Sequence, residues 1–413
     1  MKPRTWTGIA AIAILLSFQC DQVFGQSSAN PSSDNLTSLR KSAEQGDVTA
    51  QSNLGLVFEI GKEVPKDEAE AIKWYRRAAN QGLAVAQLNL GMCYTMAKGV
   101  AKDDAEALKW YKKSAEQGNA VAQFNVGHSY ENGLGVSKNI VESLEWFKKS
   151  SEQGYPAAQY EVGLRYLSGN GMPQNPAEAF KWFKKAADQG FDKAQYNVGF
   201  CYYAGVGVAK DLTEAVKWFR KSADQGFASA QGNLGACYAQ GEGVPKDDVE
   251  AVKWYRLAAD QGNARAQSNL GRCYTYGKGV ANNDAEAVKW YKKAAIQGEP
   301  KAQYCLGFCY AQGQGTPKDN IEAAKWSERA ANQGESASQY ILGVLLTQGQ
   351  GITPNLELAY KWWSLAAVAG EVNAIKNLRI ISKDMTSEQI AKAQQITKDW
   401  KPKMERRIVI VKE

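Results

Sequence analysis

Nine tryptophans recur along this chain at a fixed interval of 36 residues, with no insertion or deletion between them. They are Trp74, Trp110, Trp146, Trp182, Trp218, Trp254, Trp290, Trp326 and Trp362. A constant period of this length is typical of solenoids, in which each unit is too small to bury its apolar face alone and must stack on its neighbours. The spacing therefore predicts a repeat protein with an extended surface, for which binding is the first function to consider.

Each repeat contains two stretches with the apolar spacing of a helix, joined by a short glycine-containing segment. In the second repeat, the first stretch places five residues on one helical face: Ala86, Gln87, Leu90, Gly91 and Tyr94. Glycine costs about 1 kcal/mol relative to alanine inside a helix, so its recurrence at the Gly91 position predicts that a neighbouring helix backbone passes close by. We therefore predict an all-α solenoid of nine helix-loop-helix repeats over residues 47–370.

The second stretch of each repeat begins with acidic residues and ends with small ones. Asp103 and Glu106 have the N-cap and third-position spacing at which side-chain oxygens accept bonds from unpaired helix amides. Paired small residues such as Ala186 and Ala187 stand close to the large Trp182, and small residues against large ones interlock stacked helices. A tryptophan stripe that lines a ligand site is the alternative, but its repetition in every unit favours a structural core.

Basic residues cluster in the last turns of the second helices, for example Lys112 and Lys113. Cations there complement the helix dipole, and acidic residues stand nearby. The formal net charge of +7 is modest for 413 residues. We therefore predict a solvated structural face and no nucleic-acid partner.

This repeat resembles a known family. The pattern A-Q-x-x-L-G-x-x-Y-x-x-G-x-G-V-x-K-D-x-x-E-A-x-x-W-Y-x-K-A-A-x-Q-G, readable almost whole at residues 230–262, is similar to the Sel-one-like repeat, a relative of the tetratricopeptide repeat. The resemblance covers about residues 38–382. It implies a right-handed α-superhelix that serves as a scaffold for protein partners, with no shared catalytic residues, so we expect no catalytic site, metal or cofactor.

The first 25 residues have the composition of a secretory signal peptide. Lys2 and Arg4 precede an apolar run from Gly8 to Phe18, and small or aliphatic residues lead to a cleavage site near Gly25. The run is too short to span a bilayer comfortably, and no later segment approaches the length of a transmembrane helix. We expect an exported protein, periplasmic or secreted.

The segments outside the repeats predict caps and flexible ends. Thr386, with Gln389 at capping-box spacing, is expected to open a last helix that runs towards Trp400. The expected organisation is a signal peptide at 1–25, a disordered leader at 26–36, an N-terminal cap helix at 37–46, capping helices at 371–402 and a tail at 403–413.

The cysteines form a ladder rather than pairs, because Cys93, Cys201, Cys237, Cys273 and Cys309 share one repeat position. Stacked helices lie about 8–10 Å apart, whereas a disulfide needs Cα atoms within roughly 7 Å. Cys305 and Cys309 are four residues apart on one helix and could share a soft metal, yet no other ligand completes a site there. The more favoured interpretation is a small buried hydrophobe.

The candidate binding surface lies on the first helices, at positions that vary between repeats. By analogy with related solenoids, these helices line the concave side, so the side chains would form an aromatic groove; aromatic residues and arginine are favoured interface anchors. Packing between adjacent repeats is the alternative role. The candidate residues are Phe124, His128, Tyr160, Leu164, Tyr196, Phe200, Tyr203, Arg272, Tyr304 and Phe308, flanked by Glu131, Leu167, Ser268 and Tyr340.

Three functions compete on this evidence. The leading hypothesis is an exported, non-enzymatic scaffold whose groove holds a protein or an extended peptide. A cell-wall glycan is the alternative ligand, because aromatic faces also stack on sugar rings. A hydrolase that acts on cell wall or on β-lactams is less supported: a cysteine-rich branch of the resembled family has a penicillin-related activity, but here the second helices hold no cysteine and His128 has no catalytic partner at fixed spacing.

Overall fold

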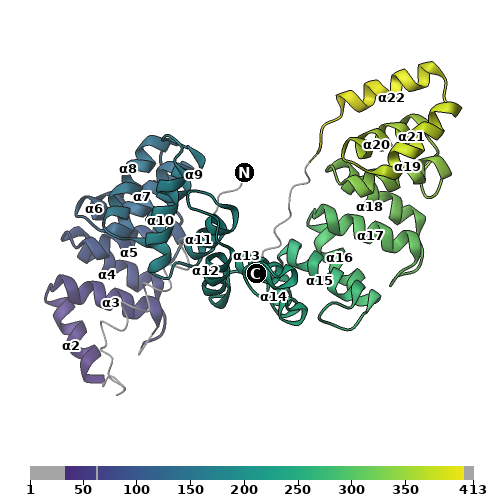
Figure 1. Cartoon of the computed structure of the whole chain (residues 1–413). Helices are drawn as coiled ribbons and strands as arrows, with labels where there is room; N and C mark the ends of the chain where they lie inside the picture. The colour runs from purple at the N-terminus through teal and green to yellow at the C-terminus, as the bar shows by residue number, and fades with distance from the viewer. Residues whose placement is uncertain (1–32, 62–63, 404–413) are drawn as a thin grey trace. The chain divides into compact units, whose positions relative to one another are not determined.

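The computed structural model describes residues 33–61 and 64–403, and their regular structure is entirely helical (Figure 1). The predicted all-α class and the solenoid of helix pairs are confirmed. The predicted signal peptide, most of the leader and residues 404–413 of the tail lie outside the described residues. No helix within the described ranges is long and apolar enough to span a bilayer.

Each repeat forms two helices of 13 residues. The first helices are α3(Val48–Ile60), α5(Ala84–Met96), α7(Ala120–Asn132), α9(Pro156–Ser168), α11(Asp192–Ala204), α13(Ala228–Gln240), α15(Ala264–Tyr276), α17(Pro300–Gln312) and α19(Ser336–Gln348). The second helices are α4(Glu68–Asn80), α6(Asp104–Glu116), α8(Ile140–Glu152), α10(Pro176–Asp188), α12(Leu212–Asp224), α14(Asp248–Asp260), α16(Asp284–Ile296), α18(Asn320–Asn332) and α20(Leu356–Val368).

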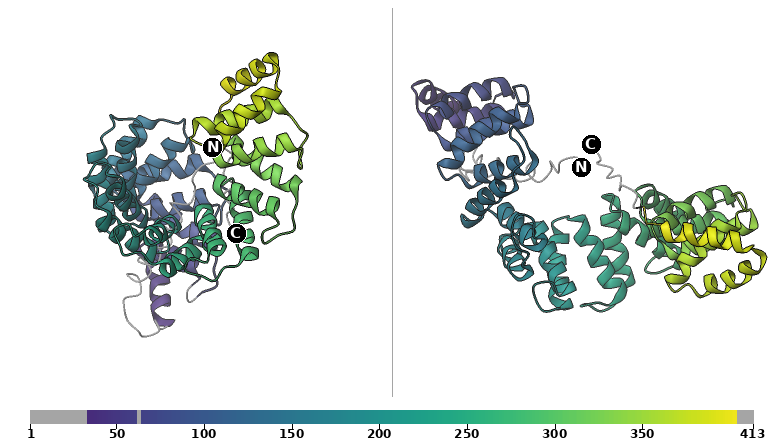
Figure 2. Two further views of the ribbon diagram at one scale, coloured as in Figure 1. Left: turned by 45° about the vertical axis from the view of Figure 1, so that its right-hand side comes forward. Right: turned by 90° about the horizontal axis from the view of Figure 1, so that it is seen from above.

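The chain divides into two compact units, which we call the N-terminal unit (up to residue 194, with 206–208) and the C-terminal unit (195–205 and from 209 onward). Within each unit, helices that follow one another in sequence pack side by side, as both views in Figure 2 show. The boundary falls inside α11, so most of that helix belongs to the C-terminal unit.

Glycines permit close approach at two places in each repeat. At Gly91, an added Cβ would lie 2.6 Å from the ring of Tyr111 and 3.1 Å from the carbonyl oxygen of Ala107, both on the paired second helix. The predicted close approach is therefore correct, although an aromatic ring and not only backbone occupies the space. In the loop, Gly135 has a φ of +68° and a Cβ there would collide with the backbone carbonyl of Asp104 in the preceding repeat.

Six of the nine tryptophans are buried in the core as predicted, and Trp146, Trp182 and Trp326 are partly buried against it. Trp110 is 5% exposed and packs among residues of the preceding second helix and its own first helix, including Tyr75 and Leu90. Its indole Nε1 donates to Glu106 Oε1 over 2.8 Å. Asp103 is the N-cap, as predicted, but the carboxylate of Glu106 binds this indole and Lys109.

A glutamine ladder links the repeats. In eight repeats, the glutamine of the Gln-Gly step that ends the second helix donates its side-chain amide to the glutamine of its own first helix over 2.7–2.8 Å, as Gln297 does to Gln267. Gln267 in turn donates to the carbonyl of Ala259, at the end of the preceding second helix, over 3.0 Å. The first helices α5, α7, α9, α13, α15 and α17 are thus tied to the second helices on both sides of them in sequence.

Additional helices lie at both ends of the repeats. α2(Ser33–Glu44) begins four residues earlier than the expected cap helix, so the end of the expected leader is helical. After the last repeat come α21(Val372–Asp384) and α22(Ser387–Asp399), and the predicted capping box between Thr386 and Gln389 is present. Trp400 then packs edge-on against Trp362, with ring centroids 6.0 Å apart.

Candidate functional site

First helices of the C-terminal unit expose side chains along one stripe that the rest of the repeat leaves uncovered. In α15 the stripe consists of Arg265, Asn269, Arg272 and Tyr276, at i, i+4, i+7 and i+11, while the intervening residues up to Tyr274 are buried. This spacing follows one side of an α-helix. We call the residues at these four positions of successive first helices the first-helix stripe.

The predicted residues occupy two main positions of the first helices, that of Phe124 and that of His128. Only the His128 position lies on the first-helix stripe. Phe200 is 42% exposed, Phe308 is 39% exposed and Arg272 is also exposed. His128 and Leu164 occupy the same register in the N-terminal unit and are half-buried. The aromatic and basic side chains that were predicted at this register are therefore accessible mainly in the C-terminal unit.

The other predicted register turns into the packing between repeats. Phe124 is only 4% exposed, with ring centroids 5.4 Å from both Phe147 and Tyr155, so its assignment to a binding surface is corrected to a core role. Tyr160 lies 5.7 Å from Phe183 and 5.5 Å from Phe191 in the same way.

The C-terminal unit repeats this arrangement. The ring of Tyr196 lies 5.8 Å from Phe219 and 5.3 Å from Phe227, and Tyr304 is half-buried at the same register. Tyr203, from the flanking register, donates its hydroxyl to Glu242 over 2.8 Å. Neighbouring residues of a helix are about 100° apart, so residues four positions before and three positions after the His128 register lie on the same side of it. The exposed stripe consists of residues three positions before and four positions after that register, and these lie on the other side.

The sequence reasoning missed the asparagines of the stripe. Asparagine stands three residues before the Arg272 register in six repeats: Asn53, Asn89, Asn125, Asn197, Asn233 and Asn269. The available signal was this recurrence itself, whereas the predicted surface was restricted to positions that vary between repeats.

The stripe of the C-terminal unit is positively charged and has apolar parts. Arg265, Arg272 and Lys301 are exposed on α15 and α17, and no acidic residue occupies a stripe position from α13 to α19. At the end of the stripe, Val344 and Ile380 border a hollow of about 370 Å³ between α19, α20 and α21, which Trp363 and the exposed Asp384 also line. The surface therefore combines cations with apolar anchors.

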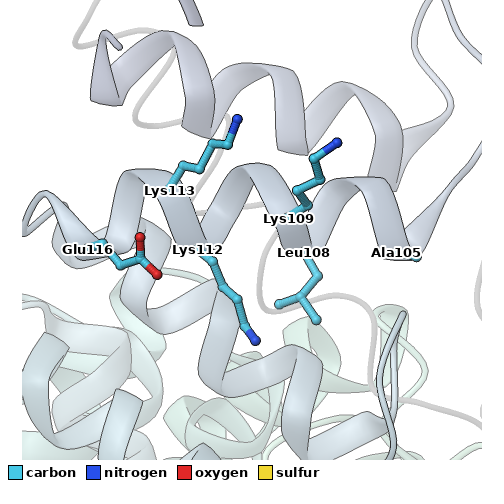
Figure 3. A pocket seen from close by; sticks show the side chains of 6 residues that line it. All are labelled: Ala105, Leu108, Lys109, Lys112, Lys113 and Glu116. Carbon is cyan, nitrogen blue, oxygen red and sulfur yellow. The ribbon is translucent and has the colours of Figure 1, made fainter. Parts of the chain in front are cut away.

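The basic residues of the second helices have a structural role. Figure 3 shows Lys109 and Lys113 on one side of α6 and Lys112 on the other, around a hollow of about 360 Å³. The ammonium group of Lys113 lies 4.2 Å from the centroid of the Trp110 ring, and the corresponding cation covers the tryptophan in most other repeats. Lys112 binds the hydroxyl of Tyr130 over 2.8 Å. These contacts account for the cluster through packing.

Reactive groups are few on the described surface. The six cysteines between residues 93 and 309 are free thiols, and burial raises the pKa of Cys237 to about 11 and that of Cys309 to about 12. At neutral pH such thiols stay protonated, and the thiolate is the nucleophile and metal ligand. Among the described residues, no group of three or more His, Cys, Asp or Glu side chains is placed to hold a metal ion.

The comparisons with known proteins agree with this architecture. The Sel1 repeat model matches nine consecutive segments that together span residues 48–370. A crystal structure of a protective antigen from uropathogenic Escherichia coli strains, which displays an SLR fold, is 32% identical, with 93% of each chain covered and a TM-score of 0.61. A Sel1 repeat protein from Oxalobacter formigenes is 33% identical over 79% of this chain and 96% of its own, with a TM-score of 0.55. No curated protein sequence matches the chain.

Proposed function

Because the chain belongs to the Sel1 repeat family, we propose that it is a scaffold that holds a protein partner on the first-helix stripe of its C-terminal unit. Proteins of this family are generally scaffolds for protein–protein interaction. The observation that carries the proposal is the exposure of Phe200, Arg272 and Phe308 at one register, in three of the four repeats from α11 to α17. Aromatic residues and arginine dominate binding energy at interfaces when a partner buries them.

A comparison between the units supports this choice of surface. At the register of Arg272, the N-terminal unit has Leu56 and Met92, which are 4% and 6% exposed. Those side chains already contribute to intramolecular packing. Phe200 and Phe308 keep about two-fifths of their surface in solvent, which costs free energy that a partner would recover.

We further propose that the protein acts outside the cytoplasm, in the periplasm or as a secreted protein. The support is the basic start, apolar run and small-residue cleavage site of residues 1–25. We propose binding without catalysis, because the buried thiols are protonated and the ring of His128 stacks on that of Phe124, with centroids 6.5 Å apart.

The test is a crosslinking pull-down with the exported form of the protein. The variant carries Phe200→Ala, Arg272→Ala and Phe308→Ala, and the matched control carries Val249→Ala, Leu257→Ala and Ile321→Ala, which are 49–57% exposed on second helices. We expect a protein that is captured by the wild type and the control but not by the stripe variant. Equal capture by all three proteins would contradict the proposal.

A glycan ligand is the second candidate, favoured by the aromatic rings on the stripe. Tyr276 is 66% exposed on α15, and Phe308 lies on the stripe of the next first helix. Exposed rings stack on sugars as readily as they contact peptide side chains. Titration with soluble cell-wall glycan fragments, followed by tyrosine and tryptophan fluorescence, distinguishes the two: a saturable change that is lost in the stripe variant would favour the glycan.

A further inference from the structure

The helix α21 keeps the place of a first helix but has no second helix of its own. Its residues 372–384 follow those of α19 by one period of 36 residues, so α21 is the first half of a tenth repeat. The next helix in the chain, α22, packs against α20 and hardly contacts α21. Both helices end the C-terminal unit (Figure 1). One face of α21 is therefore left without the partner that covers it in the complete repeats.

The contacts of a complete repeat identify this face. In α15, Gln267 accepts a hydrogen bond from Gln297, at the end of the paired second helix, over 2.8 Å. A Cβ added to Gly271 would lie 2.7 Å from the ring of Tyr291, and the hydroxyl oxygen of Thr275 lies 2.9 Å from that of Tyr291. These three first-helix positions have the spacing i, i+4 and i+8, which follows one side of a helix. The paired second helix covers that side.

In α21 the same positions are occupied by exposed side chains of a different kind. Ile375, Arg379 and Lys383 stand where the complete repeat has its glutamine, glycine and threonine, and all three are exposed. Lys376 is also exposed, at the position where Tyr196 packs on the paired second helix. The arginine fills the space that a ring of the second helix enters in the other repeats. This face therefore does not accept a second helix in the usual packing, either from this chain or from another copy.

The exposed side of α21 combines cations with aliphatic side chains. We call it the α21 face, which consists of Val372, Ile375, Lys376, Arg379 and Lys383. Val372 is 61% exposed, and Val368, four residues earlier at the end of α20, is 90% exposed. Within the described ranges none of the three cations forms an ion pair, and Asp384 is the one acidic residue of α21. Cations alone would give the polar end that a solenoid needs, but exposed aliphatic side chains cost free energy and are left unexplained by that role.

We propose that the α21 face binds the surface of a bilayer that contains anionic phospholipids. Aliphatic residues beside lysine and arginine on one exposed helix face are typical of interfacial binding, because the aliphatic side chains enter the headgroup region and the cations attract anionic lipids. A bilayer surface imposes no fixed shape, which suits a face whose arginine excludes a regularly packed helix. The α21 face does not include Phe200, Arg272 or Phe308, so this inference is independent of the proposed protein-binding surface.

The test is co-sedimentation of the exported form of the protein with vesicles of phosphatidylglycerol and phosphatidylcholine, compared with vesicles of phosphatidylcholine alone. We expect binding to the anionic vesicles only, with an affinity that falls as the salt concentration rises. The variant Lys376→Gln, Arg379→Gln and Lys383→Gln should bind roughly 100-fold more weakly, since each cation near an anionic surface contributes about fivefold. The matched control removes three exposed cations from second helices, by Lys73→Gln, Lys109→Gln and Lys181→Gln, and should bind like the wild type.

A second variant tests the aliphatic part of the contact. Val368→Thr, Val372→Thr and Ile375→Thr should weaken binding to the anionic vesicles by at least about tenfold, because each apolar carbon that enters the bilayer contributes up to about fourfold. The matched control is Val141→Thr, Val249→Thr and Ile321→Thr, at residues that are 55–62% exposed on second helices, and it should bind like the wild type. Hydrogen exchange with the vesicles present should show added protection of the α21 amides.

The inference is overturned if the wild type does not bind the anionic vesicles, if both α21 variants bind as tightly as the wild type, or if the matched controls lose as much affinity as they do. Capture of an acidic protein through the α21 face, without vesicle binding, would overturn it in favour of a protein partner. The variant Phe200→Ala, Arg272→Ala and Phe308→Ala should keep its affinity for the vesicles. Failure of the bilayer inference is therefore distinguishable from failure of the proposed function.

Discussion

Gln267 and Asn269 lie two residues apart on α15 and provide a sharp test of which recurring residues hold the repeats together. Gln267 is 4% exposed, donates to the carbonyl of Ala259 over 3.0 Å and accepts from Gln297 over 2.8 Å. The amide of Asn269 makes no such bond within the described chain. Replacing each with alanine should therefore have opposite consequences for stability.

The magnitudes follow from the contacts. Gln267→Ala removes two hydrogen bonds worth about 1 kcal/mol each. It also leaves the amide of Gln297, a residue that is 8% exposed, with only a long bond of 3.4 Å to the carbonyl of Lys293, which adds about 1 kcal/mol or more, for a loss of about 2–4 kcal/mol. Asn269→Ala removes no bond and exchanges a poor helix former for the best one, a gain of up to about 0.7 kcal/mol. The expected difference between the variants is thus about 2–5 kcal/mol.

The assay is native-state hydrogen exchange of the α14, α15 and α16 amides, supported by urea unfolding followed by tryptophan fluorescence. Exchange is preferable because repeat arrays do not always unfold in a single step. The reasoning is refuted if Gln267→Ala leaves protection of these helices within about 0.5 kcal/mol of the wild type, or if Asn269→Ala lowers it by more than about 1 kcal/mol.

Three further predictions concern the loops and the buried side chains. Gly135→Ala should lower the melting temperature measured by circular dichroism far more than Gly118→Ala, because both have positive φ but only Gly135 faces backbone, that of Asp104; equal shifts would contradict the contact. Cys237 should react with a thiol reagent at pH 8 only after unfolding in urea, since burial raises its pKa to about 11, and rapid labelling of native protein would argue against that burial. The free energy of unfolding should fall as pH rises through about 9 to 12, because burial raises the folded-state pKa of Cys237 and Cys309 above the ordinary value of 9.0. The stabilising contribution of the two thiols is complete below pH 9 and is lost as pH approaches the folded-state values. A melting temperature that stays constant over this range would contradict the contribution.

The repeat architecture was predictable because its signals are local and periodic. Trp110 and Gly91 recur with their neighbours at one spacing, so the helices, the loop and the core position of the tryptophan follow from periodicity. The N-cap role of Asp103 follows from its place before an apolar stretch. The bond from the indole of Trp110 to Glu106 was not predicted, because Glu106 also stands at the third position after the N-cap and that spacing already explained it.

The candidate site was predicted only in part, because the sequence shows neither which helix face the next repeat covers nor which recurring residues have a role other than packing. Phe124 and His128 lie on one side of the helix by spacing alone, yet only the packing of the next repeat decides which of them is covered. A surface restricted to positions that vary between repeats omits every recurring residue, which is correct for Gln267, a residue that ties repeats together, but also omits Asn269, which lies on the stripe. A position can recur because every repeat contacts its neighbour or because every repeat contacts the same ligand.

The glutamine ladder bears on how such a chain can evolve. Its bonds join residues 30 positions apart within a repeat, as for Gln297 and Gln267, and 8 positions apart across a junction, as for Gln267 and Ala259. Because no link reaches beyond the adjacent repeat, duplication or loss of a 36-residue segment of the gene would recreate equivalent partners at the new junction. The length of the binding surface could therefore change in whole repeats, without a compensating mutation elsewhere in the core.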